Sequence, residues 1–130
     1  MAEGMVKGIG VDAVDIEELR GMCGEALDTA FVRHTFTEAE VAQAKGRPDP
    51  AQFLAGRFAC KEAAFKALAF RTAEGGFDFR IVETLHDEHG HPCIRPGDQL
   101  RAVMAEAGAT ELLASITNEG GLAIAFVVAQ

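Results

Sequence analysis

The sequence predicts a single α+β domain in which one long central helix packs on a small antiparallel sheet. Three observations lead to this class. Segments rich in Val and Ile lie near both ends of the chain, an alanine-rich helical segment lies between them at 51–69, and turn residues mark two hairpins. Helices and antiparallel strands therefore alternate irregularly, which is typical of α+β proteins. The chain has 130 residues, so we expect one domain over 1–130.

The first predicted element is a strand over 5–16, because Val and Ile dominate this segment. Gly8 and Gly10 interrupt the apolar pattern and indicate positions that another backbone or a ligand approaches closely. Asp12 lies near the end of this strand, in otherwise apolar surroundings. A carboxylate there caps the following helix, forms an Asx turn or binds a ligand.

Capping residues define the helices that follow. Thr37 and Glu40 form a capping box that opens a helix ending near Lys45. Asp49 can cap the long central helix, with Pro50 in its first turn. The remaining predicted elements are a helix over 17–30 with a break near 21–24, a hairpin with strands 79–86 and 91–95, a helix ending at Gly108, and a hairpin with strands 112–117 and 122–129.

The composition excludes several classes of protein. Twelve Lys and Arg against twenty Asp and Glu give a net charge of −8, which argues against non-specific binding to nucleic acid or to an anionic membrane. Cys23, Cys60 and Cys93 are odd in number and lack metal-site spacing, which favours a reduced, cytoplasmic compartment. We find neither a signal peptide nor an apolar run that spans a membrane.

The central helix carries charges although it is apolar on nearly every side. Such a helix is normally buried, so Arg57, Lys61, Glu62 and Lys66 need partners. One interpretation is an ordinary ion pair between Glu62 and Lys66 with Lys61 extending to solvent. The other is a site for an anion such as a pyrophosphate, because three cations accompany one carboxylate. A magnesium ion would join Glu62 to Asp12, since Mg²⁺ takes one or two carboxylates together with phosphate oxygens.

Two motifs resemble the 4′-phosphopantetheinyl transferase family, in particular its small holo-acyl-carrier-protein synthase type. They are Gly-Ile-Gly-Val-Asp at 8–12 and Phe-Leu-Ala-Gly-Arg-Phe-Ala-Cys-Lys-Glu-Ala-Ala-Phe-Lys-Ala-Leu at 53–68. The stretch 31–68 is also similar to the transferase domain of fungal fatty acid synthases. The resemblance implies the 4′-phosphopantetheinyl transferase fold. It also implies transfer of phosphopantetheine from coenzyme A to a serine of an apo acyl-carrier protein, releasing adenosine 3′,5′-bisphosphate.

The same resemblance implies roles for the site residues. Asp12 and Glu62 would bind Mg²⁺, and Glu62 would also accept the serine proton as general base. Lys66 would contact the transferred phosphate, while Lys61 and Arg57 would provide positive charge for the pyrophosphate and the 3′-phosphate. Small members of this type form homotrimers with active sites between subunits, and the alanine-rich helix is compatible with such an assembly.

Three segments depart from the family pattern. The family's Gly-Thr-Gly loop is replaced by Ala-Phe-Arg-Thr at 69–72, and Asn118 stands where a histidine is common, although it can still hydrogen-bond a ligand. The helix after the first strand is basic in many relatives but begins Glu17-Glu18-Leu19-Arg20 here, so docking of an acidic carrier would depend on Arg20, with Arg33, His34 and Lys45 as further candidates.

Other candidate sites are weaker. His86, His89 and His91 are expected to be exposed turn residues rather than zinc ligands, and Cys60 to be a core residue. Two other functions remain open on these grounds. One is a catalytically weak module of the same fold that binds coenzyme A or a carrier protein. The other is a structural protein with Lys61, Glu62 and Lys66 in an internal ion network.

Overall fold

The computed structural model describes residues 5–68 and 78–130. A three-stranded antiparallel sheet is formed by β1 (Gly8–Asp15), β5 (Leu122–Ala129) and β4 (Leu112–Glu119), in that order. The central strand, β5, is the second arm of the hairpin that closes the chain. The first and last strands therefore lie side by side, with Gly8 opposite Ala129 and Asp15 opposite Leu122.

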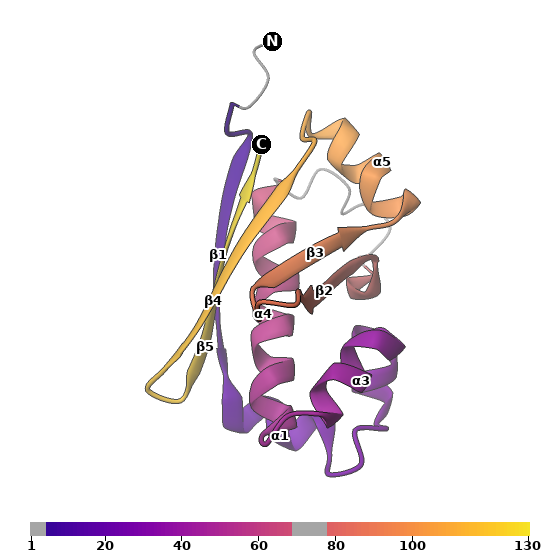
Figure 1. The fold of residues 1–130 in the computed structure, drawn as a ribbon, viewed down its shortest axis with the longest axis vertical. Helices are drawn as coiled ribbons and strands as arrows, with labels where there is room; N and C mark the ends of the chain where they lie inside the picture. Colours follow the sequence, from indigo (N-terminus) through magenta and orange to yellow (C-terminus); the bar gives the residue numbers. More distant parts are fainter. Residues whose placement is uncertain (1–4, 69–77) are drawn as a thin grey trace.

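The long helix α4 (Pro50–Ala67) runs along one face of this sheet and separates it from the rest of the molecule (Figure 1). Asp49 caps α4 by accepting a hydrogen bond from the backbone N–H of Gln52, as the sequence predicts. The helix can approach the sheet closely because alanines meet alanines and valines there. The contacting core residues include Ala59, Ala63, Ala67, Ala125, Val127 and Ala129.

The two glycines of β1 contact the α4 backbone, which explains their place in the motif. A Cβ atom built on Gly8 would lie 1.9 Å from the carbonyl oxygen of Ala67, and one on Gly10 would lie 1.9 Å from that of Ala63. No side chain can occupy such a position unless the strand moves away from the helix. Of the two possibilities predicted for these glycines, a backbone or a ligand, the structure has the backbone of α4.

We expect Gly10→Ala to destabilise the protein by about 2–3 kcal/mol, because the added methyl group meets a backbone carbonyl that cannot move aside. Chemical denaturation measures this free energy of unfolding. Gly97→Ala is the matched control, since a Cβ at Gly97 meets no atom within 4 Å and the φ of Gly97 is −92°. Equal stability of the two variants would show that the close contact between β1 and α4 is absent in solution.

A second layer covers the other side of α4. It contains α3 (Glu38–Lys45), the two-stranded sheet of β2 (Val82–His86) and β3 (Pro92–Pro96), and α5 (Asp98–Glu106). The predicted strand over 79–86 is wrong in its first turn, because Phe79–Ile81 forms a 3₁₀ helix, η2. The cause is local: the Asp78 carboxylate accepts a hydrogen bond from the N–H of Arg80 and caps the turn.

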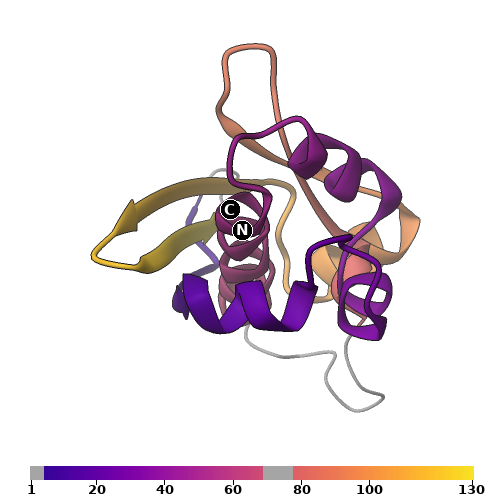
Figure 2. The ribbon, with the colours of Figure 1, turned by 90° about the horizontal axis from the view of Figure 1, so that it is seen from below.

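The prediction of one interrupted helix over 17–30 is also wrong. The chain forms α1 (Ile16–Cys23) and a separate short helix, α2 (Ala30–Thr35). Figure 2, the view from below, shows α1 lying across the end of α4. Gly24 ends α1 with a φ of +69°, and Thr29 caps α2 through the N–H of Val32. Thr29 is thus a second capping residue within the segment that was predicted as one helix.

The fold class is confirmed: the structure is α+β, with the long helix packed on an antiparallel sheet. The opposite face of that sheet carries apolar side chains that no described residue covers. Ile9 is 61 % exposed, Val11 53 %, Leu113 47 % and Phe126 44 %. Val11 and Phe126 are cross-strand neighbours, so these side chains form a continuous surface. We call Ile9, Val11, Leu113 and Phe126 the outer sheet face.

Candidate active site

Strand alternation places Asp12 beside the functional residues of α4. Gly8, Gly10 and Asp12 are two residues apart, so all three lie on the face of β1 that meets the helix. The Lys66 ammonium donates hydrogen bonds to the Asp12 carboxylate at 3.1 Å and to the carbonyl oxygen of Val11 at 3.1 Å. The structure thus brings together two predicted site residues that are 54 positions apart.

Asp12 and Glu62 line one pocket, of about 290 Å³, between β1, α1 and α4. Its remaining polar groups are the carboxylates of Asp15 and Glu18, and its apolar wall includes Phe58. We call this the carboxylate pocket. Phe58 is held in place by edge contacts with Phe31 and by Phe79, with ring centroids 5.6 and 5.5 Å away.

The electrostatics of Glu62 reflect this environment. Burial, and then the negative charge of Asp12, raise the pKa of Glu62 above its ordinary value, while Lys66 acts in the opposite direction. The ammonium of Lys66 forms its ion pair with Asp12, so the interpretation of an ordinary Glu62–Lys66 helix pair does not describe this structure. A second carboxylate beside Glu62, whose own charge is disfavoured, forms a favourable site for a cation.

Lys61 lies elsewhere, although it is the residue before Glu62. Its side chain is fully buried, and the ammonium donates to the Glu40 carboxylate and to the carbonyl oxygens of Phe79 and Val82, each at 2.8 Å. Glu40 is equally buried and also accepts from the backbone N–H groups of Thr37 and Thr84. Lys61 therefore does not extend to solvent. Its ammonium is buried against the Glu40 carboxylate, so it is poorly placed to provide the positive charge for phosphates that the resemblance implies.

Arg57 and Asn118 line a second pocket, also of about 290 Å³, which shares no residue with the carboxylate pocket. The Arg57 side chain is only 6 % exposed, and its guanidinium lies 4.0 Å from the centre of the Phe53 ring. Its buried Nε has no hydrogen-bond partner among the described residues. The pKa of Arg57 is lowered to about 10, chiefly by burial, and the nearby charge of Arg47 acts in the same direction.

Arg47 is a residue of this second pocket that the sequence reasoning did not select. Its guanidinium lies 4.8 Å from the same Phe53 ring, and its Nη2 is 3.4 Å from Nδ1 of His86. Neither Arg47 nor Arg57 forms an ion pair with a described carboxylate. The signal in the sequence is the position of Arg47 two residues before the helix cap at Asp49. We call the second pocket the arginine pocket. It is suited to an anion because Arg47 and Arg57 line it and have no described carboxylate as an ion-pair partner.

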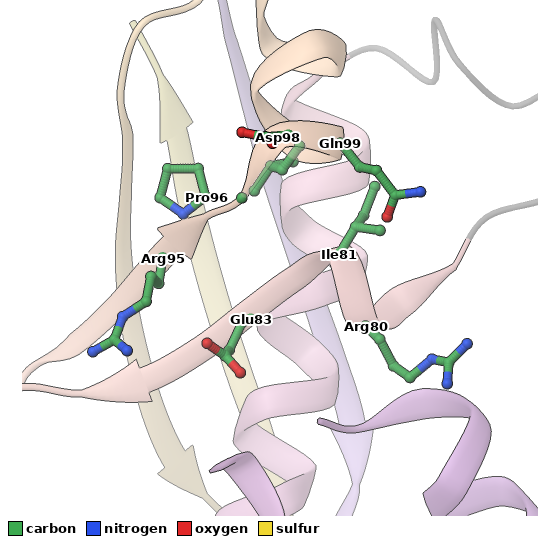
Figure 3. A pocket seen from close by; sticks show the side chains of 9 residues that line it. Arg80, Ile81, Glu83, Arg95, Pro96, Asp98 and Gln99 are labelled. Carbon is green, nitrogen blue, oxygen red and sulfur yellow. The ribbon is translucent and has the colours of Figure 1, made fainter. Parts of the chain in front are cut away.

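A larger cavity, of about 480 Å³, lies between β2, β3 and the start of α5 (Figure 3). In Figure 3 the side chains of Arg80 and Arg95 extend in opposite directions, with Glu83 between them. Arg80 is paired with Asp78 at 3.0 Å. This cavity contains none of the predicted site residues.

Two of the three predicted turn histidines, His89 and His91, are exposed in the β2–β3 turn, and Cys60 is fully buried in the core. The prediction is wrong for His86, which is the last residue of β2 and is half-buried, because its ring packs against Phe53 with the ring centroids 5.8 Å apart. In the described parts of the chain, no group of three or more His, Cys, Asp or Glu is arranged to hold a metal. Across the same parts, no helix has the length and apolarity needed to cross a membrane. The predicted departure at 69–72 lies outside the described residues.

Known proteins agree with the motif and the geometry. The family model described as the 4′-phosphopantetheinyl transferase superfamily matches residues 8–127. A holo-[acyl-carrier-protein] synthase from Clavibacter michiganensis is 37 % identical over 97 % of each chain. The synthase of that name from Clostridium acetobutylicum is 34 % identical over 97 % of this chain and 98 % of its own.

Solved structures support the same assignment. The holo-[acyl-carrier-protein] synthase of Neisseria meningitidis has a TM-score of 0.80 at 30 % identity, over 97 % of this chain and 99 % of that one. The Helicobacter pylori synthase, solved in complex with coenzyme A, has a TM-score of 0.77 at 27 % identity, over 94 % and 99 %. The chain therefore belongs to the 4′-phosphopantetheinyl transferase superfamily and is an enzyme of the holo-[acyl-carrier-protein] synthase type.

Proposed function

We propose that the protein transfers phosphopantetheine from coenzyme A to a serine of an apo acyl-carrier protein at the carboxylate pocket, with Mg²⁺ bound by Asp12 and Glu62. The observation that carries this site is the shared pocket of the two carboxylates, with the pKa of Glu62 raised by burial and by Asp12. A bound dication would remove that repulsion. Two carboxylates without a third protein ligand suit Mg²⁺, which completes its shell with water and substrate phosphate.

When bound, Mg²⁺ supplies Lewis-acid stabilisation of the charge on the pyrophosphate. The protein groups then have separate roles. Glu62, or a water that it holds, accepts the proton of the serine hydroxyl as this attacks the phosphorus, because its carboxylate lines the pocket in which the reaction takes place. Lys66 lies 3.1 Å from Asp12 with its side chain 40 % exposed, so it can turn its ammonium to the transferred phosphate. The reaction is a displacement at phosphorus with adenosine 3′,5′-bisphosphate as leaving group.

The arginine pocket supports a second part of the proposal. Coenzyme A carries one phosphate outside its pyrophosphate, on the 3′-hydroxyl of the ribose. We assign this phosphate to Arg57 and Arg47, whose charges are not neutralised by described carboxylates, with Asn118 as a hydrogen-bonding neighbour. Lys61 has no part in this assignment because its ammonium is buried on Glu40.

We expect Arg47→Ala to raise the KM for coenzyme A about tenfold and to leave the KM for 3′-dephospho-coenzyme A nearly unchanged, because only the former has the phosphate that Arg47 binds. Arg47 is exposed, so the variant should fold normally. Lys45→Ala removes the same charge from an exposed position outside the pocket and should alter neither value. An equal effect of Arg47→Ala on both substrates would contradict the assignment.

The two pockets share no lining residue, which supports a site completed by a second copy. We propose a homotrimer in which the outer sheet face is an interface and the arginine pocket of one subunit serves the carboxylate pocket of its neighbour. Val11→Lys places a charge on this face beside Phe126. The variant should be smaller than the native protein in sedimentation and less active.

We also propose that 1–130 form one catalytic domain and that the enzyme acts in the cytoplasm, where coenzyme A is available and the three free cysteines stay reduced. The direct test is incubation with Mg²⁺, coenzyme A and an apo carrier protein. Mass spectrometry should detect one added phosphopantetheine on the carrier, and a chelator should abolish the transfer. Binding of coenzyme A without transfer to any carrier would contradict the proposed activity.

A further inference from the structure

We propose that His86 is a positioning residue for the arginine pocket, because its ring fixes the Arg47 guanidinium in the place where it would meet the 3′-phosphate of coenzyme A. This inference rests on the proposed function, which assigns that phosphate to Arg47 and Arg57. It adds a residue that does not itself line the pocket.

Arg47 is a side chain with few contacts of its own. It is exposed and follows Gly46, the residue that ends α3, so its side chain starts from a bend rather than from a helix. A long, exposed side chain samples many rotamers, and a ligand that binds it must restrict them at a loss of affinity. Among the described residues, the guanidinium makes one hydrogen bond, from Nη2 to Nδ1 of His86 over 3.4 Å. His86 is therefore the residue that can hold the guanidinium before a ligand arrives.

The chemistry of this contact defines the state of the histidine. A guanidinium has only N–H donors, so Nδ1 of His86 is the acceptor. The ring proton then lies on Nε2, and the ring is neutral. A separation of 3.4 Å is long for a hydrogen bond, so the bond is weak and its effect on coenzyme A binding should be modest.

The His86 ring is itself well fixed. Its backbone N–H donates to Oε1 of Gln43 at 3.1 Å, and its carbonyl oxygen accepts from Nε2 of the same side chain at 3.5 Å. Gln43 lies in α3, four residues before Arg47, so one short segment contacts both the backbone and the ring of His86. A residue held in this way can in turn restrict Arg47.

Phe53 connects His86 to both cations of the pocket. The guanidinium carbons of Arg57 and Arg47 lie 4.0 and 4.8 Å from the centre of the Phe53 ring, where the electrons of the ring attract a cation. The ring of His86 meets that of Phe53 at 90°, with the centroids 5.8 Å apart. His86 thus contributes an acceptor for Arg47 and a packing surface for Phe53, and substitutions can separate the two.

The charges around His86 favour its neutral form. Burial, and then the positive charges of Arg47 and Arg57, lower the pKa of His86 below its ordinary value. The neighbouring Asp87 acts in the opposite direction, but its carboxylate already accepts hydrogen bonds from two backbone N–H groups of the following turn. At about pH 8 the ring is therefore neutral and Nδ1 can accept. The test is made at this pH.

Two replacements separate the acceptor from the ring. His86→Phe keeps an aromatic ring against Phe53 but has a carbon in place of Nδ1, whereas His86→Asn loses the ring but has an amide oxygen bonded to Cγ, as Nδ1 is. His86→Phe should raise the KM for coenzyme A about threefold and leave kcat and the KM for 3′-dephospho-coenzyme A unchanged. His86→Asn should bring the KM for coenzyme A back close to the native value. Unchanged kinetics with 3′-dephospho-coenzyme A also show that each variant is folded.

The double variant with Arg47→Ala tests whether His86 acts through Arg47. In a protein that already carries Arg47→Ala, His86→Phe should have no further effect on the KM for coenzyme A. His34→Phe is the matched control, because it makes the same replacement at an exposed position of α2 that lines neither pocket. It should alter none of these values.

The possible failures are distinguishable. A native KM for coenzyme A in His86→Phe, with the selective loss in Arg47→Ala still present, would overturn the role of His86 and leave the phosphate assignment intact. A threefold effect that persists beside Arg47→Ala would also overturn it, since His86 would then act without Arg47. If Arg47→Ala affected both substrates equally, the phosphate assignment and the role of His86 would both be wrong. Absence of transfer from either substrate would overturn the proposed function itself.

Discussion

Replacing Glu62 by glutamine is expected to lower kcat/KM for phosphopantetheine transfer by about a thousandfold, while the stability of the protein stays the same or increases. The loss follows because the amide can neither accept the serine proton nor bind Mg²⁺ as a carboxylate does. The stability should not fall, because burial and Asp12 make the charge of Glu62 unfavourable in the folded protein. The two readouts are the rate of carrier modification and the midpoint of thermal unfolding.

Asp12→Asn provides the companion result. It should also abolish most of the activity, and in the metal-free protein it should lower the pKa of Glu62, whose shift has the Asp12 charge as its second cause. Glu106→Gln removes a carboxylate from the exposed end of α5 and should change neither rate nor stability. If both site variants kept native activity, the assignment of the metal ligands would be wrong.

Replacing Lys61 by methionine is expected to destabilise the protein by about 3–5 kcal/mol, because it leaves the Glu40 carboxylate buried without its counter-charge. Burial raises the pKa of Glu40 and lowers the pKa of Lys61. The positive charge of Lys61 acts against the first shift, and the negative charge of Glu40 acts against the second. The ammonium also holds η2 and β2 to α4 through the carbonyls of Phe79 and Val82. Denaturant unfolding measures the loss.

The double variant Lys61→Met with Glu40→Gln separates the charge from the packing. It removes both charges, and the single amide oxygen of the glutamine can still accept one of the two hydrogen bonds from the N–H groups of Thr37 and Thr84, so it should be clearly more stable than Lys61→Met alone. Lys66→Met, at the exposed lysine of the same helix, should cost less than about 1 kcal/mol. A Lys61→Met protein as stable as the Lys66→Met protein would contradict the buried pair.

Local sequence signals predicted most of the fold. The capping box at Thr37, the cap at Asp49 and the glycines of the C-terminal hairpin act over a few residues, and each is where the structure has it. The errors arose where two local signals competed. Within 17–30, good helix-forming residues outweighed the stop at Gly24 and the new cap at Thr29. At Phe79, an apolar β-type pattern outweighed the Asp78 cap.

The sequence predicted the site residues less completely than the fold. The motif predicted Asp12, Glu62 and Lys66 as a group. In the structure Asp12 and Glu62 line the carboxylate pocket, and the Lys66 ammonium hydrogen-bonds to Asp12. The motif could not distinguish Lys61 from Lys66, because both are lysines of one apolar helix. The two lysines differ because Lys61 pairs with Glu40. Glu40 lies 21 residues before Lys61 and is buried only when α3 packs on α4.

The amino-acid sequence alone accounts for the helix caps, the strand alternation and the order of elements, because these depend on neighbours three or four residues apart. It also determined the family, through two motifs whose glycines and carboxylates are needed at fixed spacing. Which charges are available depends on the folded chain. It buries Lys61 on Glu40 and pairs Arg20 with Asp49, and among the described residues no carboxylate forms an ion pair with Arg47 or Arg57. Desolvation and ion pairing depend on three-dimensional neighbours, which the order of residues along one chain does not specify.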